Sequence, residues 1–152
     1  MNFNFLKILI FASLIAAAGS TYACPDLTGQ YLCKQNASHA EMLYSFNRVQ
    51  NGTGWEYWMD ADLAVDGTPV ASYNFLADGV EREAVDAVSG QKLLLKADCT
   101  ADVLQVTGTT NIPGRPTPVR FSELLSLTPA GDLLDVSIDI NGATIEEICT
   151  QY

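Results

Sequence analysis

The sequence is poor in basic residues. Its 152 residues include 8 Lys and Arg against 18 Asp and Glu, which gives a formal net charge of −10 at pH 7. A chain this acidic repels phosphate backbones and anionic headgroups, so we do not expect nucleic acid as a partner. The acidic residues are scattered rather than blocked, which is typical of a solvated surface.

Motifs of catalysis, metal binding and cofactor binding are also missing. Nucleophilic catalysis usually needs a histidine base, and the only histidine, His39, lies in the polar stretch "KQNASHAE" between two predicted strands. The chain has no G-x-S-x-G nucleophile elbow and no glycine-rich phosphate loop. Its cysteines lack the clustered spacing of a zinc site, and "DADLAVDG" lacks the spacing of a calcium loop. We therefore predict a protein that is not an enzyme and that uses no cofactor and no metal.

The longest apolar run lies at the N-terminus. A single charged residue, Lys7, precedes an apolar run that ends at Ala18, and small residues follow it. This is the layout of a secretory signal peptide, and the run is too short to span a bilayer. We predict a signal peptide at 1–23 and a single domain at 24–152 with no transmembrane segment. The alanine-rich region before the cut is typical of a bacterial protein, so we expect a secreted or periplasmic location.

Two membrane alternatives stay open. A mature chain that starts at Cys24 could carry a lipid on that cysteine, although the bulky Tyr22 fits the lipoprotein pattern poorly. An outer-membrane barrel would also alternate along its strands and would often end in an aromatic residue, here Tyr152. The residues at every second position before Tyr152, which would share one face of the last strand, form no apolar stripe that could face lipid. Simple export is therefore favoured over lipidation and over an outer-membrane barrel.

Turn signals divide the remaining chain into short segments. Asn-Gly, Asp-Gly and other turn pairs recur, mostly about 11 to 15 residues apart. Between them, "GWEYWMDADL", "QKLLLKADC" and "DLLDVSIDI" alternate apolar and polar residues. In the last of these, Leu134 and Val136 are predicted to face the core and Asp135 to face water. Only "VEREAVDAV" suggests a turn or two of helix. We predict an all-β fold in which an antiparallel meander of about 8–10 strands closes into a barrel.

The four cysteines predict two disulfides, because the chain is short and expected to be exported. Three pairings are possible in principle. If the strands simply alternate direction, the strands that carry Cys99 and Cys149 end on the same side of the barrel. This argument favours Cys99–Cys149, with Cys24–Cys33 joining the entering segment to the first strand.

The first predicted strand carries a short motif. In "DLTGQYLC", Gly29 and Tyr31 stand where lipocalin-like (calycin) barrels have Gly-x-Trp on their first strand. The chain resembles this group of small secreted proteins in that motif and in its run of strands. Lipocalins also place an arginine near the end of the barrel, whereas this chain has none after Arg120. The resemblance implies a cup-shaped barrel that binds a small apolar molecule.

The same alternation predicts what the barrel interior contains. Glu123 shares a face with Phe121 and Leu125, so its carboxylate needs a partner, for which Arg48 and Arg82 are candidates, or a raised pKa. Seven aromatic residues also face inward, and with Glu123 they either line a ligand cavity or fill a solid core. These aromatic residues are Tyr44, Phe46, Trp55, Tyr57, Tyr73, Phe75 and Phe121.

Two functions follow from this interior. The leading hypothesis places function on the surface, in an interaction with another protein or with the cell envelope. Its clearest candidate is the loop "TTNIPGRPTPVR", which carries Arg115 and Arg120 on an otherwise acidic protein. The alternative is a lipocalin-like carrier of a small apolar ligand in the barrel interior. The residues identify neither the protein partner nor the ligand.

Overall fold

The computed structural model describes residues 24–152, except 35–39, 53, 112–113 and 139–141. The strands in chain order are β1 (Gly29–Cys33), β2 (Met42–Asn51), β3 (Gly54–Leu63), β4 (Pro69–Ala77), β5 (Arg82–Val85), β6 (Lys92–Thr100), β7 (Val103–Thr110), β8 (Val119–Leu127), β9 (Leu133–Ile138) and β10 (Thr144–Gln151). The predicted all-β class is thus confirmed. The described residues include no helix long and apolar enough to cross a membrane. The predicted signal peptide and His39 lie outside the described residues.

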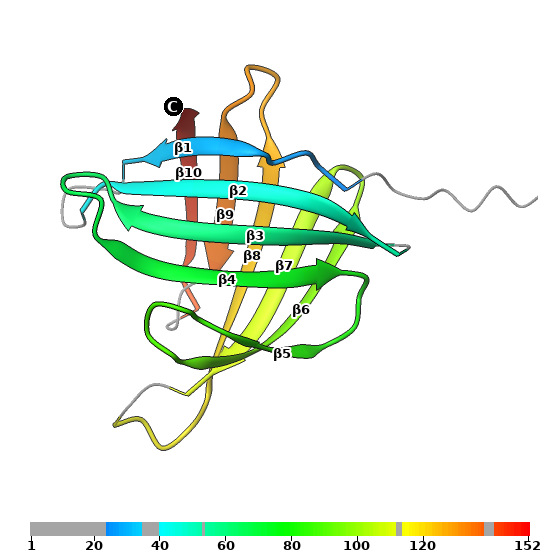
Figure 1. Ribbon diagram of the computed structural model, residues 1–152, viewed down its shortest axis with the longest axis vertical. Helices are drawn as coiled ribbons and strands as arrows, with labels where there is room; N and C mark the ends of the chain where they lie inside the picture. The colour runs from blue at the N-terminus through cyan, green and yellow to red at the C-terminus, as the bar shows by residue number, and fades with distance from the viewer. Residues whose placement is uncertain (1–23, 35–39, 53, 112–113, 139–141) are drawn as a thin grey trace, which may run out of the picture.

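The strands form one sheet that closes on itself. Its order is β4-β3-β2-β1-β10-β9-β8-β7-β6-β5, so the first strand pairs with both the second and the last. A parallel contact between Ala77 of β4 and Ala97 of β6 closes a barrel of nine strands, beside which the short β5 pairs with β6. In Figure 1, β1–β4 cross in front of the steeper β6–β10. The predicted meander and its closure are therefore confirmed, with one parallel contact added.

The segment "VEREAVDAV" is not helical. Arg82–Val85 form β5 because their backbone pairs with Lys92–Leu95 of β6. Beyond β5, Asp86 and Ala87 dock on β4, where the Ala87 amide donates to the Ser72 carbonyl at 2.7 Å. This short piece fills the wall of the barrel where β4 and β6 diverge.

The predicted disulfide pairing is wrong. The bonds are Cys33–Cys149 and Cys24–Cys99. The prediction rested on strand direction alone and did not consider which residues meet where the first and last strands pair. The register of β1 with β10 brings Cys149 opposite Cys33. Cys24 is left to bond with Cys99 of β6. Because its sulfur is used in that bond, Cys24 offers no thiol for a lipid thioether in this disulfide-bonded form.

The predicted faces of β3 and β6 are confirmed, whereas that of β9 is inverted. Leu133 is 1% exposed and faces inward, and Asp135 follows it on the same face by strand alternation. Leu134 and Val136 consequently face outward. The register explains this, because Leu133 lies opposite the inward, fully buried Cys149 of β10.

The N-terminal segment at 24–28 covers one end of the barrel, which we call the closed end. Leu27 of this segment is 0% exposed, and Cys24 joins it to β6. The Tyr57 hydroxyl of β3 donates to the Pro25 carbonyl at 2.6 Å. The closed end is therefore fastened by a covalent bond, an apolar contact and a buried hydrogen bond.

Arg48 of β2 completes the closed end. Its Nη1 donates to the Cys24 carbonyl at 2.7 Å, and its Nε lies 3.1 Å from the Asp26 carboxylate. The guanidinium stacks on the Trp55 ring at 4.1 Å from the ring centroid. Arg48 thus ties the N-terminal segment to β2 through both Cys24 and Asp26.

Candidate ligand site in the open half of the barrel

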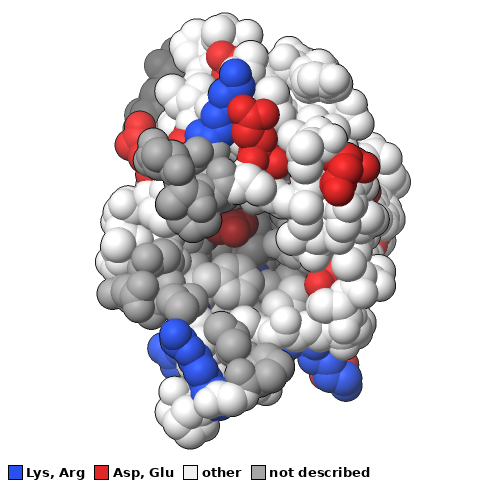
Figure 2. Space-filling model, turned by 90° about the vertical axis from the view of Figure 1, so that its left-hand side faces the viewer, with Lys and Arg blue, Asp and Glu red and all other residues white. Residues whose placement is uncertain are grey.

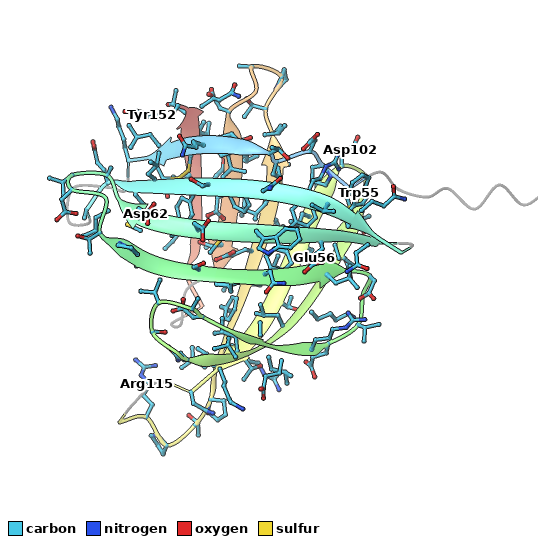
Figure 3. All side chains as sticks on the ribbon, in the orientation of Figure 1. Trp55, Glu56, Asp62, Asp102, Arg115 and Tyr152 are labelled. Atoms are coloured by element: carbon cyan, nitrogen blue, oxygen red, sulfur yellow. A yellow bond between two sulfur atoms is a disulfide. The ribbon has the colours of Figure 1, made fainter. Side chains whose placement is uncertain are left out.

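The other half of the barrel interior is incompletely filled, and we call it the open half. Its inward-facing residues keep part of their surface accessible to solvent. They are Met42, Tyr44, Ala71, Tyr73, Ala84, Leu93, Phe121, Glu123, Asp135, Ser137 and Glu147. Figure 2 shows the molecule hollowed on one side, with an acidic side chain at the bottom of the hollow. Figure 3 shows Trp55 of the closed end and Asp62 at opposite ends of β3.

Three carboxylates share the interior wall of the open half, and we call them the interior carboxylates: Glu123 of β8, Asp135 of β9 and Glu147 of β10. Asp135 lies directly opposite Glu147, and Glu123 lies opposite Ser137, two residues along from Asp135. Directly opposite side chains have Cβ atoms about 5 Å apart, and diagonal ones about 7–8 Å. The register therefore gathers the three acids into one cluster on adjacent strands.

Among the residues that the structure describes, the interior carboxylates have no cationic partner. Of the two arginines predicted to reach Glu123, Arg48 pairs with Asp26 at the closed end and Arg82 pairs with Asp78 on the surface at 2.6 Å. Both predicted partnerships are therefore wrong. Asp135 Oδ1 and Glu147 Oε1 are completely buried and accept no hydrogen bond. Buried polar atoms in native proteins are rarely left in this state, which makes the cluster unusual.

The pKa values of the three acids reflect this isolation. Burial raises the pKa of Glu123 to about 7, and the charge of Asp135 adds to the shift. Burial likewise raises the pKa of Asp135 to about 6, with the charge of Glu147 adding to it, and burial also raises the pKa of Glu147. Each shift favours the neutral acid, as expected for a carboxyl that has lost water and gained no partner.

Asp86, in the turn that docks on β4, shows the usual behaviour of a buried carboxylate. It accepts hydrogen bonds from the backbone amides of Ser72, Val88 and Ser89 and from the Ser89 hydroxyl. Burial alone would raise the pKa of Asp86, but these hydrogen bonds outweigh burial and lower it. The fold can thus satisfy a buried carboxylate with backbone amides, and it does not do so for the interior carboxylates.

Aromatic rings face the interior carboxylates across the barrel. Burial and the charges of the carboxylates raise the pKa of Tyr44 on β2, and burial together with the charge of Glu123 raises that of Tyr73 on β4. The phenols therefore lie within electrostatic reach of acids on β8–β10. Phe121 lies against Gly108 of β7, where a Cβ atom would overlap the Phe121 ring. The missing side chain makes room for that ring.

All eight residues predicted for the interior face inward, but they divide between the two regions. Trp55 and Tyr57 belong to the closed end, and Phe46 and Phe75 are buried between the two regions. The four in the open half are Tyr44, Tyr73, Phe121 and Glu123.

Sequence reasoning missed Asp135 and Glu147. The signal for Glu147 was its place two residues before Cys149. A disulfide-bonded cysteine in a small barrel is usually buried, and a strand returns to the same face every second residue, so Glu147 should face the interior as Cys149 does. Asp135 was hidden by the stronger apolar alternation of Leu134 and Val136 on the outer face.

Two further depressions open beside β5, and the larger one is also lined by the inward-facing Phe75, Ala84 and Leu95. One of about 510 Å³ lies along the junction of β4 and β5, where Glu56 accepts hydrogen bonds from Asn51 and Asn74. The other, of about 310 Å³, contains Lys92 and Glu83, which form an ion pair at 2.9 Å. Among the described residues, neither depression is lined by a buried side-chain polar atom without a partner, which favours the open half as the functional site.

The interior carboxylates do not form a metal site in this arrangement. Within the described residues, the one group of three ligand atoms close enough for a metal ion is Cys33, Glu147 and Cys149, all within 4.8 Å of one another. The two sulfurs of that group are bonded to each other, so they cannot act as thiolate ligands. The oxygens of Glu123, Asp135 and Glu147 are too far apart to hold one ion together.

A scan against protein-family models and a search of the curated proteins found no match to this chain. The function must therefore be inferred from the geometry of the open half itself.

Proposed function

We propose that this protein is a lipocalin-like carrier that binds a small organic molecule in the open half of the barrel. The observation that carries the proposal is the incomplete filling of the interior, where aromatic rings and buried polar atoms remain accessible or unpaired. Ligand pockets typically combine an apolar, aromatic lining with a few polar groups that orient the ligand. The combination of Tyr44, Tyr73 and Phe121 with three carboxylates fits that description.

The contrast with the closed end supports this proposal over a solid core. Protein interiors normally pack as densely as organic crystals, and the closed end does so around Leu27 and Tyr57, both 0% exposed. The open half could have been filled by larger residues at Ala71 and Ala84, which face inward on β4 and β5. Small residues at these positions instead preserve an interior space.

Binding explains the site better than catalysis. A glycosidase needs two acids on opposite sides of the bond that it cleaves, whereas the three interior carboxylates lie side by side on β8–β10. The interior wall of the open half, as far as the structure describes it, also carries no lysine, arginine or histidine that could stabilise an anionic intermediate. We therefore infer a non-enzymatic role.

The neutral fluorophore N-phenyl-1-naphthylamine tests the proposal. We expect its fluorescence to rise saturably with one site per chain. The substitution Ala71→Phe, which fills the interior from β4, should abolish the rise, whereas Val70→Phe on the outer face of the same strand should leave it unchanged. Circular dichroism would verify that both variants are folded. A fluorescence rise that is not saturable, or that Ala71→Phe leaves intact, would refute binding in the interior.

A second candidate function uses the loop between β7 and β8. Its residues 114–118 are all exposed, and Figure 3 shows Arg115 projecting away from the barrel. Within the described residues, neither Arg115 nor Arg120 forms an ion pair, although the chain has an excess of acids. We propose this loop as a contact for an acidic protein partner or envelope component. Affinity capture with the intact protein and with an Arg115→Ala, Arg120→Ala variant would test it, since a partner of the loop should be lost from the variant.

We also propose that the protein is exported. Two disulfides in a chain of this size are typical of an oxidising compartment, in keeping with the predicted signal peptide. The intact mass of protein purified from its own host without reductant would test this. We expect the mass of 24–152 less four hydrogens, and a mass that includes 1–23 would contradict cleavage.

A further inference from the structure

We propose that the ligand of the open half is an organic cation, namely an amine whose ammonium group lies among Glu123, Asp135 and Glu147 and whose apolar body lies against the facing rings. This inference rests on the proposed function and specifies the chemical class of its ligand. It is drawn from three independent features of the interior: the unpaired carboxylate oxygens, the aromatic wall opposite them and the spacing of the three acids.

The unpaired oxygens supply the first argument. Asp135 Oδ1 and Glu147 Oε1 are completely buried and accept no hydrogen bond, and Glu123 forms no ion pair among the described residues. Placing three acids together without partners costs free energy, because like charges on opposed strand positions repel and each acid has lost water. An ammonium carries up to three donors and a positive charge, so it would satisfy the oxygens and neutralise the repulsion.

The rings supply the second argument. Tyr44 and Tyr73 are close enough to the interior carboxylates for the charges to interact, although they belong to the opposite wall of the barrel. Phe121 precedes Glu123 by two residues on the same face of β8. Aromatic faces attract cations, and they also cover the apolar body of an amphipathic ligand. The open half therefore offers a carboxylate wall to the ammonium and an aromatic wall to the rest of the molecule.

The spacing of the acids supplies the third argument, because it selects among cations. The three carboxylates do not bring their oxygens within 4.8 Å of one another, the separation that would qualify them to hold one metal ion. Cross-strand geometry instead places the Cβ atom of Asp135 about 5 Å from that of Glu147 and about 7–8 Å from that of Glu123, while Glu123 and Glu147 are two strands apart, at least about 10 Å. This spread suits an ammonium that contacts the carboxylates through separate N–H groups. A carboxylate or phosphate ligand would meet repulsion both from this cluster and from the net charge of −10.

Three eight-carbon probes that differ only in the head group test the inference: octylamine, octanol and octanoate. Isothermal titration calorimetry at pH 8 measures the affinity of each for the intact protein. We expect octylamine to bind at least about tenfold more tightly than octanol, because charge-assisted hydrogen bonds exceed neutral ones. We expect octanoate to bind most weakly of the three.

Two neighbouring substitutions on β10 locate the selectivity. Glu147→Gln removes an interior charge, and Glu146→Gln removes an exposed charge from the outer face of the same strand. We expect Glu147→Gln to weaken octylamine about tenfold and to leave octanol unchanged, while Glu146→Gln should leave both unchanged. If Glu147→Gln fails to fold, Asp135→Asn and Glu123→Gln serve the same purpose.

The outcomes separate this inference from the proposed function. Equal affinity for octylamine and octanol, tighter binding of octanoate, or an octylamine affinity insensitive to all three interior substitutions would overturn the organic cation and leave the carrier standing. Binding of N-phenyl-1-naphthylamine without binding of any octyl probe would have the same meaning. Failure of the fluorophore and of all three octyl probes would overturn the proposed function itself.

Discussion

The closed end and the open half belong to the same barrel, yet they treat polar groups in opposite ways. At the closed end, the Arg48 guanidinium has a carbonyl, a carboxylate and an aromatic ring as partners, and the Tyr57 hydroxyl has the Pro25 carbonyl. In the open half, the Asp135 and Glu147 side chains each leave a buried oxygen without a partner. The polar groups of the first region are satisfied by the protein itself, whereas the second region leaves two buried oxygens unsatisfied.

This difference indicates how a small barrel divides its residues between stability and binding. A covalent bond, a buried apolar side chain and paired polar groups at one end can stabilise the fold enough to tolerate an unfavourable cluster at the other. Native proteins are only marginally stable, so an unpaired cluster without a function would be expected to disappear. The experiments below test the contrast by removing the stabilising features of the closed end and the destabilising ones of the open half.

The largest effect should follow loss of the closed-end disulfide. The Cys24–Cys99 bond closes a loop with a sequence separation of 75, so replacing both cysteines by serine should lower the free energy of unfolding by about 4–5 kcal/mol. Urea denaturation measures this change. We also expect Trp55 emission to shift to the red, because the segment that covers the closed end is released. Replacing Cys33 and Cys149 by serine is the control, since it should lower stability similarly without the shift in Trp55 emission.

Arg48→Met should have the next largest effect. It leaves the Cys24 carbonyl without its donor and Asp26 without its cation, so we expect the free energy of unfolding to fall by about 3 kcal/mol. Chemical denaturation at pH 7 measures the change. Arg82→Met removes an arginine whose ion pair with Asp78 lies on the exposed surface, and it should leave the denaturation midpoint unchanged. Equal effects of the two substitutions would mean that the closed end does not depend on its polar contacts.

Much of the closed end could be predicted from the sequence. Alternation correctly placed Trp55 and Tyr57 on the inward face of β3, because that strand has apolar residues on one side and acids on the other. The partners of Arg48 could not be predicted, since Cys24 and Asp26 lie in a segment without periodicity and reach Arg48 only through the closure of the barrel. The disulfides failed for the same reason, because the β1–β10 pairing joins the two ends of the chain.

The open half was predicted less well, and the reason is physical. Alternation assumes that the apolar face of a strand is the buried one. On β9 that assumption fails, because Asp135 and Ser137 face the interior while Leu134 and Val136 face outward. Such a departure is what we expect of a strand that lines the proposed binding cavity, because real proteins break local sequence rules mainly at functional sites. Glu123 was found because its neighbours on β8, Phe121 and Leu125, are unambiguous.

The pH dependence of stability should distinguish the two kinds of buried acid. The pKa values of Glu123 and Asp135 are raised to about 7 and about 6, so the folded protein binds more protons than the unfolded chain over this range. Their contribution to stability is therefore fully present below about pH 4 and is lost as the pH rises to about 7. Allowing for partial solvent access, we expect a loss on the order of 2 kcal/mol between pH 4.5 and pH 8, measured by urea denaturation.

Glu123→Gln combined with Asp135→Asn should flatten this dependence. Among the described residues, the other titratable groups that face the cluster are Glu147, whose pKa burial raises, and Tyr44 and Tyr73, whose pKa values burial raises above the ordinary value of a phenol. Asp86, whose charge reaches Tyr73, has a lowered pKa and contributes in the opposite sense, because its stabilisation is lost only as the pH falls through that lowered value. A dependence unchanged in the double variant would assign it to groups outside the open half.

The smallest effect on stability should be the most informative about function. Glu147→Gln removes a charge directly opposite Asp135, so at pH 8 it should raise the free energy of unfolding by about 0.5 kcal/mol, whereas the exposed Glu146→Gln should not. Thermal and chemical denaturation of the two variants in parallel measure the difference.

The sign of this change distinguishes a structural role of Glu147 from a binding role. If a residue is retained for packing, replacing it lowers the stability of the protein. If a residue is retained for binding an amine, replacing it raises the stability of the protein and lowers its affinity for the amine. The reason is that the same unpaired charge destabilises the empty barrel and attracts the ligand. Opposite signs in the two measurements on Glu147→Gln would therefore identify the open half as a site rather than a defect, and a loss of stability would place Glu147 among the structural residues.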